Sequence, residues 1–412
     1  MSRLSATEFL RRKFMSKLSI VGGGFAGVWG AMSAAAERIR LGASAKDIQI
    51  NLISNDPHLV IRPRLYEGAN PEMRTPLKPL LDVIGVEFEL ARVREIIPSA
   101  GHIILEAAGL VDPRDYDSLI LASGSHMPGL PVPGIKEHGF SIDTFAETAR
   151  FDRHLENLMQ QYAEGGGEFT IVVVGASFTG IELVTELRQR LGESVNLVLL
   201  DRSSVVGGEL GENLTPLIDG ALSDCNVEIM LEADIVALDT HGLVLVDGRV
   251  LQSKAVVFAT GLQASPLTKG FNAPRDASGR LEVNEFLKLP DEDAVFVAGD
   301  VARAMADDNH ATFMSCQHAM VLGRYAGHNA VRQLTGQALL PYRQETYATC
   351  LDLGPAGAVF TMGWDREVQK TGADGKDRKQ QINRQWIYPP DPAAGADAIF
   401  QSISLAPEAE AA

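Results

Sequence analysis

Cysteine is scarce in this sequence, with three cysteines among 412 residues. Cys225, Cys316 and Cys350 are an odd number, lie far apart and lack the spacing of a zinc site or a disulfide framework. This pattern excludes a small disulfide-stabilised scaffold, and we expect no bound metal. The chain is therefore predicted to work in a reducing compartment, the cytoplasm.

Long apolar runs are also missing. No stretch reaches the roughly 18 consecutive apolar residues that a membrane-spanning helix requires. Residues 1–16 are basic without an apolar segment behind them, so they are interpreted as an N-terminal extension rather than a signal peptide. Residues 401–412 are acidic and form no basic amphipathic helix, so peripheral membrane contact is not expected. The Ala/Glu-rich end of the chain is predicted to be disordered.

Basic residues are fewer than acidic ones: the chain has 37 Lys and Arg and 53 Asp and Glu, which gives a net charge of -16. This charge repels phosphate backbones, so nucleic acid is not an expected partner. Hydrophobic residues make up 45% of the chain, the proportion of an ordinary globular protein. At about 150 residues per domain, the length predicts two to three domains. Whether the chain forms a homodimer is left open.

A glycine-rich turn follows the first β-type run, Lys17–Val21. Gly22, Gly24 and Gly27 have the spacing of a dinucleotide-binding turn, and an Ala-rich helical stretch begins after Val28. In such a turn the first glycine permits the sharp bend, the second lets the backbone approach a pyrophosphate, and the third packs the helix on the strand. The helix N-terminus then faces the phosphates.

The same arrangement occurs a second time. The β-type run Phe169–Val174 leads into Gly175 and Gly180, and a helix is expected directly afterwards. Several β-type segments follow each unit, and each series closes in an apolar strand and a glycine, at residues 119–124 and 256–261. Matching order over roughly a hundred residues indicates an internal duplication of a nucleotide-binding α/β unit.

With these features the sequence resembles the type II NADH dehydrogenase-like family of flavoproteins with two dinucleotide-binding domains. The resemblance covers residues 17–365 and is carried by residues 20–27, 63–67, 172–187, 259–261 and 299–300. It implies an α/β fold with two Rossmann-like domains, the second inserted in the first, and a small C-terminal α+β region. It also implies that FAD binds at the first glycine turn and NAD(P)H at the second.

The implied domain bounds are 17–143 with 280–335 for FAD, 144–279 for NAD(P)H, and 336–412 for the C-terminal region. Asp300 is implied to approach the ribityl chain of FAD, and Val93 to contact its adenine through the backbone. The residues implied to bind the two cofactors are Gly22, Gly24, Phe25, Ala26, Gly27, Ser54, Arg64, Val93, Ser123, Gly124, Gly175, Ser177, Gly180, Asp201, Gly261, Gly299 and Asp300.

Asp201 ends the strand 195–200, where a carboxylate accepts hydrogen bonds from ribose hydroxyls and repels a 2'-phosphate, so NADH is expected. Arg202 leaves NADPH open. Two positions depart from the family pattern. Ser177 replaces the middle glycine of the second turn, and Ser54 stands where an acid usually binds the adenosine ribose of FAD.

Glu182 and Glu186 share one helix face just after the second turn. The resemblance places Glu182 beside the nicotinamide and flavin, where it is expected to orient the nicotinamide or assist proton movement. Glu186 is interpreted as a solvated surface charge. Because no cysteine precedes position 225, a redox cysteine pair on the first helix is excluded, and Cys316 is interpreted as a structural thiol.

The expected reaction is hydride transfer from NADH to FAD, followed by electron transfer to a quinone-like or other small acceptor. The family's glutamine-rich quinone stretch is not retained at residues 311–318, so the acceptor is left open. Two alternatives remain. A reductase of a small redox protein would need a basic patch such as Arg62/Arg64 or Arg378/Lys379, and a flavin-bound sensor would bind NADH without turnover.

Overall fold

The computed structural model describes residues 15–163, 165 and 169–405. The expected N-terminal extension therefore lies outside the described residues, apart from its last two positions. The same holds for most of the triple-glycine linker before Phe169 and for residues 406–412 of the acidic tail.

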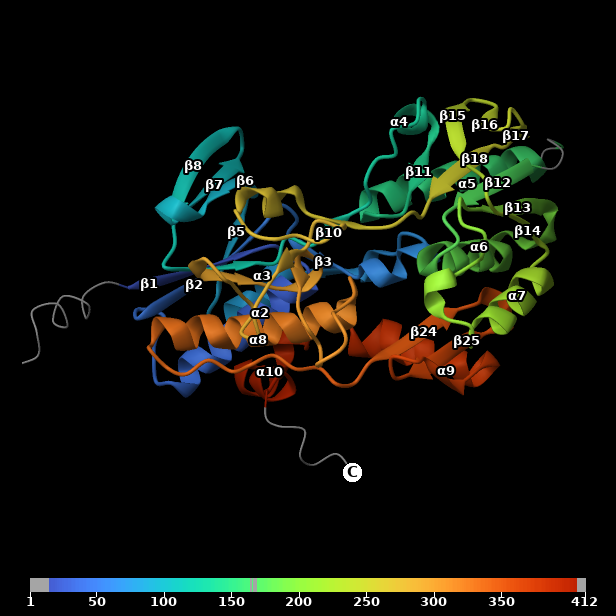
Figure 1. Ribbon diagram of the computed structural model, residues 1–412. Helices are drawn as coiled ribbons and strands as arrows, with labels where there is room; N and C mark the ends of the chain where they lie inside the picture. Colours follow the sequence, from blue (N-terminus) through green and yellow to red (C-terminus); the bar gives the residue numbers. More distant parts are fainter. Residues whose placement is uncertain (1–14, 164, 166–168, 406–412) are drawn as a thin grey trace, which may run out of the picture.

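The first sheet has six strands in the order β21-β22-β9-β1-β2-β5. These strands are β1 (Ser16–Val21), β2 (Ile48–Ser54), β5 (Glu87–Leu90), β9 (Ser118–Leu121), β21 (Lys288–Leu289) and β22 (Glu292–Val297). All neighbours are parallel except β21 and β22. The central strands are continuous apolar runs because helices cover the sheet. Two of these helices, α2 (Phe25–Arg40) and α8 (Cys316–Leu334), pack side by side (Figure 1).

The second sheet has five parallel strands in the order β11-β18-β12-β13-β14. Its strands are β11 (Phe140–Ser141), β12 (Phe169–Val174), β13 (Val195–Leu200), β14 (Val227–Met230) and β18 (Ala255–Phe258), and its helices are α5 (Phe145–Ala163), α6 (Phe178–Leu191) and α7 (Thr215–Asp224). The chain leaves the first sheet after β9 and returns to it at β22, which pairs with β9. The expected insertion of one α/β unit into the other is thereby confirmed.

Each unit carries a small antiparallel sheet, drawn in the upper part of Figure 1. In the first unit it consists of β6 (Arg92–Ile97), β7 (His102–Ala107) and β8 (Leu110–Asp115), and in the second of β15 (Ile235–Asp239), β16 (Gly242–Leu245) and β17 (Val250–Gln252). The sequence reading did not include β8, because all of its residues are exposed and it has no apolar alternation.

Shorter elements connect these layers. They are β3 (His58–Val60), β4 (Arg74–Pro76), α3 (Leu77–Val83), β10 (Ser125–His126), α4 (Ile135–His138), β19 (Gln263–Ala264), β20 (Leu281–Glu282) and β23 (Ala302–Arg303). The helix expected from about residue 312 begins at Cys316. Its start is set by Ser315, whose hydroxyl accepts a hydrogen bond from the backbone N–H of His318.

The C-terminal region contains β24 (Ala348–Asp352), β25 (Ala358–Met362), β26 (Glu367–Lys370), α9 (Gly372–Gln381) and α10 (Ala396–Ser402). Figure 1 shows β24, β25 and α9 below the second unit, and α10 below α2 and α8. The stretch 370–379 is polar, yet α9 forms there because Gly375 lets the helix approach β25. A Cβ at Gly375 would lie 1.9 Å from the Ala358 carbonyl oxygen.

Candidate active site

The two glycine turns have the close backbone approach that their spacing predicts. Gly22 and Gly175 adopt φ values of +121° and +113°. A Cβ at Gly27 would lie 1.8 Å from the carbonyl oxygen of Gly22, and a Cβ at Gly180 would lie 1.7 Å from that of Gly175. Only glycine fits at these positions, so each helix N-terminus is held directly against the end of a strand. The unpaired N–H groups of the first turn can receive phosphate oxygens.

One continuous cleft of about 1920 Å³ runs along both glycine turns and the C-terminal region. Most of the predicted site residues lie in its wall: Gly22, Gly24, Phe25, Ala26, Ser54, Val93, Ser123, Gly124, Ser177, Glu182, Gly261, Gly299 and Asp300. Residues from sequence positions as far apart as 22 and 300 thus meet in one space. The cleft is the candidate active site.

Five other predicted residues do not line the cleft: Gly27, Arg64, Gly175, Gly180 and Asp201. Gly27, Gly175 and Gly180 act instead through the shape of the turns. Arg64 is buried away from the cleft, where its guanidinium binds both carboxylate oxygens of Glu67 and donates to the hydroxyl of Tyr388 at 2.8 Å. The structure therefore does not place Arg64 in the wall of the cleft.

Several polar atoms in the cleft wall have no partner within the described residues. They are the hydroxyl oxygens of Ser123 and Thr260, Nδ1 of His126 and Nε of Arg366 and Arg378. Buried polar atoms are rarely left unpaired, so these atoms fit a polar group bound in the cleft. Asp300 lies beside the first turn, because a Cβ on the neighbouring Gly299 would come within 2.8 Å of the Ala26 Cβ.

The carboxylate of Asp300 accepts a 2.6 Å hydrogen bond from the hydroxyl of Ser125, and burial raises its pKa. The glycine turn, the unpaired hydroxyls and this carboxylate together fit a ligand with both phosphate and hydroxyl groups. FAD is such a ligand.

Asp201 follows β13 and is turned toward the second glycine turn. Its carboxylate accepts hydrogen bonds of 2.7 Å from the backbone N–H of Ala176 and from both the backbone N–H and the hydroxyl of Ser203. Burial works against the charged form, yet these hydrogen bonds hold the pKa of Asp201 below its usual value. The side chain does not line the cleft, and its ionised oxygens face the turn where a dinucleotide would bind.

Ser177 and Glu209 meet at the N-terminus of α6. The Ser177 hydroxyl hydrogen-bonds the Glu209 carboxylate, and both side chains line the cleft. The arginine side chain of Arg366, from the C-terminal region, donates to the Glu209 backbone oxygen. The second turn therefore carries a carboxylate that the first turn lacks.

Glu182 is buried, with 4% of its surface exposed, and forms an ion pair with Lys379 of α9. Its Oε1 accepts a hydrogen bond of 2.7 Å from the Lys379 ammonium and one of 3.0 Å from the backbone N–H of Asp352. Lys379 also donates to the Cys350 carbonyl oxygen. Burial raises the pKa of Glu182 to about 7 although Lys379 opposes that shift. The cleft thus contains a carboxyl group that exchanges protons near neutral pH.

Sequence reasoning missed Lys379. A usable signal was present, because Lys376, Lys379 and Asn383 are spaced by three and four residues and so share one helix face. The polar composition of the stretch concealed that spacing, since buried helix faces are normally apolar.

The cysteines of the cleft are neutral thiols. Cys316, at the start of α8, and Cys350, on β24, both line it, and burial raises the pKa of each thiol to about 11. A thiol with such a pKa is a weak nucleophile at neutral pH. This fits the structural role expected for Cys316.

A carrier-protein reductase would need a basic patch near the cleft, and most of the candidate cations are engaged inside the protein. Arg64 and Lys379 are 4% and 6% exposed and are paired with Glu67 and Glu182. Arg62 binds the Asp143 carboxylate. Three of these four cations are thus paired with internal carboxylates, whereas Arg378 lies over the rings of Phe360 and Trp386.

Residues 16–323 match the pyridine nucleotide-disulphide oxidoreductase family. The chain belongs to this family. Among curated proteins it is 39% identical over 398 residues to the NADH dehydrogenase-like protein Rv1812c of Mycobacterium tuberculosis, covering 93% of this chain and 97% of that protein. It is 26% identical to the demethylphylloquinone reductase NdbB of Synechocystis, covering 84% and 86% of the two chains.

Among solved structures, the fold is similar to that of NDH2 from Plasmodium falciparum, with a TM-score of 0.76 at 11% identity over 94% of this chain and 97% of the other. These similarities confirm the two-domain α/β fold and the resemblance read from the sequence. The chain is an NADH dehydrogenase-like oxidoreductase of a family that binds FAD and NAD(P)H.

Within residues 15–405 as described, no helix combines the length and apolarity needed to cross a bilayer. The same residues contain no cluster of three or more His, Cys, Asp or Glu side chains suited to hold a metal ion.

Proposed function

We propose that this oxidoreductase binds FAD at the first glycine turn, accepts hydride from NADH bound at the second, and passes electrons to a quinone-like or other small acceptor. The observation that carries the proposal is the single cleft, which reaches both turns and has Glu182 in its wall. A flavin held there would accept a hydride from a reduced nicotinamide and return two electrons to an acceptor.

The residues of this chain would supply binding, orientation and proton exchange. The N-terminus of α2 faces phosphate, and Asp300 offers its carboxylate to hydroxyl groups beside that turn. Glu182 and Lys379 present a neutralised, buried pair at the same cleft. Asp201 favours NADH over NADPH, because its ionised carboxylate repels a 2'-phosphate.

The C-terminal region supports a planar apolar acceptor. Apolar and aromatic side chains line this part of the cleft: Phe313, Tyr347, Phe360, Met362, Trp386 and Ile387. Such a wall suits a quinone ring, which is flat and weakly polar. A demethylphylloquinone reductase is among the relatives, which supports the same acceptor class. All three cysteines are free thiols, which supports a cytoplasmic location.

Anaerobic rapid mixing tests the proposal. The purified protein should be yellow, or become yellow on addition of FAD, and NADH should bleach it faster than NADPH. Reoxidation is then followed with quinones, oxygen, disulfides and carrier proteins. The proposal predicts the fastest reoxidation with quinones. A colourless protein that refuses FAD refutes it, and bleaching by NADH without turnover on any acceptor identifies a sensor instead.

A further inference from the structure

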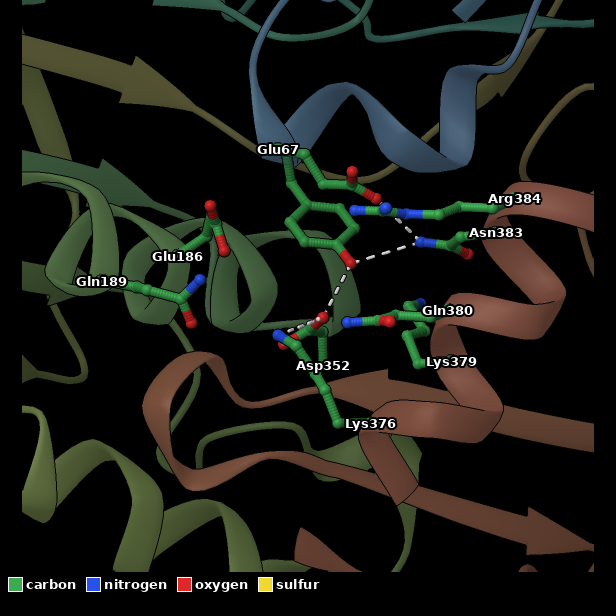
Figure 2. Close-up of a pocket in the computed structure, with 10 residues that line it drawn as sticks. Glu67, Glu186, Gln189, Asp352, Lys376, Lys379, Gln380, Asn383 and Arg384 are labelled. Carbon is green, nitrogen blue, oxygen red and sulfur yellow. Dashed lines mark hydrogen bonds and ion pairs between the residues drawn. The ribbon is translucent and has the colours of Figure 1, made fainter. Parts of the chain in front are cut away.

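A second, smaller cavity of about 190 Å³ lies between α6 and α9, and Figure 2 shows its polar lining. It shares a wall with the large cleft, because Tyr66, Lys379 and Asn383 line both spaces. Exposed residues such as Gln189 and Gln380 stand at its outer side. The cavity has room for several water molecules and the polar partners that such water requires.

Glu186 points toward this cavity in Figure 2, one helical turn after Glu182. Only 9% of its surface is exposed, so the earlier interpretation as a solvated charge was wrong. Among the described residues it makes no hydrogen bond or ion pair, since the nearby Lys376 ammonium is engaged by both oxygens of Asp352. A buried carboxyl group left free in this way is available to water in the cavity.

Hydrogen bonds connect the wall of the cavity to Glu182. The Tyr66 hydroxyl donates to Asp352 Oδ2 at 3.0 Å and accepts from the Asn383 side-chain amide at 3.3 Å. The backbone N–H of Asp352 donates to Glu182 Oε1, which the Lys379 ammonium also reaches. Glu182 thus lines the large cleft and Glu186 lines the small cavity, and a shared wall of polar side chains separates the two spaces.

Reduction of a quinone by NADH consumes one proton from solvent. NADH loses a hydride, which is one proton and two electrons, to become NAD⁺. The quinone gains two electrons and two protons to become the hydroquinone, and so NADH + H⁺ + quinone gives NAD⁺ + hydroquinone. We propose that the proton enters through the small cavity and that Glu186 relays it from water in this cavity to Glu182. This relay rests on the proposed function.

The surroundings of Glu186 suit a relay. Burial raises its pKa to about 7, while Lys376 of α9 and Arg190 of α6 lower it and Asp352 of β24 and Glu67 raise it. Lys379 and Arg384 are the other charged groups around the cavity. The raised pKa keeps Glu186 partly protonated at neutral pH. Above that pKa the carboxyl loses its proton and can no longer donate one, so a relay-limited rate falls as pH rises through about 7.

The test compares half-reactions of the FAD-loaded protein in wild type and Glu186→Gln. Menadione takes up protons when reduced, whereas ferricyanide takes one electron and no proton. We expect Glu186→Gln to slow reoxidation by menadione about tenfold at neutral pH, within the range for removal of a general acid. NADH-driven bleaching and ferricyanide reduction should stay unchanged, and the fall in menadione rate above pH 7 should become shallower, because only Glu182 of the two carboxyl groups then titrates in that range.

Two further variants separate a relay from a structural role. Gln189→Ala changes the same cavity without removing a titrating group, so it should behave as wild type. In Glu186→Ala, added formate should restore the menadione rate by carrying the proton. Infrared spectroscopy without acceptor adds a readout that is independent of activity. In wild type and Gln189→Ala, a protonated-carboxyl band should titrate near pH 7. In Glu186→Gln, the contribution of Glu186 to this band should be missing.

Equal menadione rates in Glu186→Gln and wild type would overturn the relay. An equal slowing of menadione and ferricyanide reduction would also overturn it, as would an infrared carboxyl band that the substitution leaves unchanged. If the wild type itself bleaches with NADH but reduces no quinone, the acceptor assignment fails, and the relay fails with it. That result is recognised from the wild type alone, before any variant is measured.

Discussion

At the scale of single residues, Asp201 is held ionised by hydrogen bonds from Ala176 and Ser203. Loss of the carboxylate in Asp201→Ala should reduce the preference for NADH over NADPH by about tenfold or more, since hydrogen bonds to a charged group contribute roughly 1.5–3 kcal/mol. The measurement is the rate of flavin bleaching by each nucleotide. Arg202→Ala is the opposite-charge comparison: it removes the neighbouring cation that could accept a 2'-phosphate, so it should retain or increase the preference for NADH. An unaltered ratio in Asp201→Ala would remove Asp201 from cofactor selection.

Cys316 lines the cleft but keeps its proton at neutral pH, because burial raises the thiol pKa to about 11. Replacement by serine keeps a small polar group at the same place on α8. We expect Cys316→Ser to leave NADH-driven bleaching within about twofold of wild type, since a protonated thiol contributes little nucleophilic reactivity. Stopped-flow absorbance measures this step. Its loss would show that the sulfur takes part in the reaction.

The sequence identified those site residues whose role depends on local backbone. The positions of the turn glycines follow from their spacing after a strand, whereas Asp300 and Glu182 were assigned only by the family resemblance; the structure places both of these side chains in the wall of the cleft. Lys379 could not be found that way. It reaches Glu182 from 197 positions away, and the spacing of Lys376, Lys379 and Asn383 marks a shared helix face without indicating what that face packs against.

At the scale of elements, close packing of α2 on α8 fixes the first glycine turn. A Cβ at Gly327 would lie 2.1 Å from the Gly30 carbonyl oxygen, and a Cβ at Gly323 would lie 2.2 Å from that of Ala26. Both contacts involve backbone atoms, which cannot rotate away as side chains do. The two helix backbones therefore approach this closely only because Gly323 and Gly327 lack side chains.

Gly327→Ala should push α8 away from α2 and disturb the turn that faces the phosphates. We expect a loss of about 2 kcal/mol of stability, within the range for an overpacked core, together with weaker FAD retention. Thermal unfolding and the flavin content after gel filtration are the measurements. Gly220→Ala is the control, because nothing lies within 4 Å of a Cβ there, and alanine in α7 should hold or raise the unfolding temperature. Equal behaviour of the two variants would argue against the backbone contact.

The elements of the two α/β units were predictable because each is a long apolar run or a regular amphipathic stretch. The bounds of β12 and β13 agree with the expected ranges. The C-terminal region was harder to predict. In α9 the buried positions are Gly375 and Lys379, so the helix shows no apolar face in the sequence although it has one packed side.

At the scale of the whole molecule, the C-terminal region joins the two α/β units. Lys379 of α9 pairs with Glu182 in the second unit, while Tyr388 accepts a hydrogen bond from Arg64 in the first. The first of these ties is a buried ion pair. Such a pair adds little net stability compared with apolar residues, but removal of one partner leaves an uncompensated buried charge.

A double-mutant cycle on Glu182 and Lys379 therefore has a definite expected pattern. Lys379→Met should lower stability by about 3 kcal/mol at alkaline pH, and addition of Glu182→Gln should recover most of that loss. The raised pKa of Glu182 sets the sign of the pH effect. With Lys379 present the carboxyl is protonated below about 7, and without Lys379 its pKa lies higher, so the loss in Lys379→Met should shrink as pH falls. Thermal unfolding across pH measures the cycle.

Lys78→Met, which breaks the exposed pair with Asp82, should change stability by less than about 1 kcal/mol. A pH-independent loss in Lys379→Met that Glu182→Gln does not recover would mean that Lys379 stabilises the C-terminal region through its packing rather than its charge.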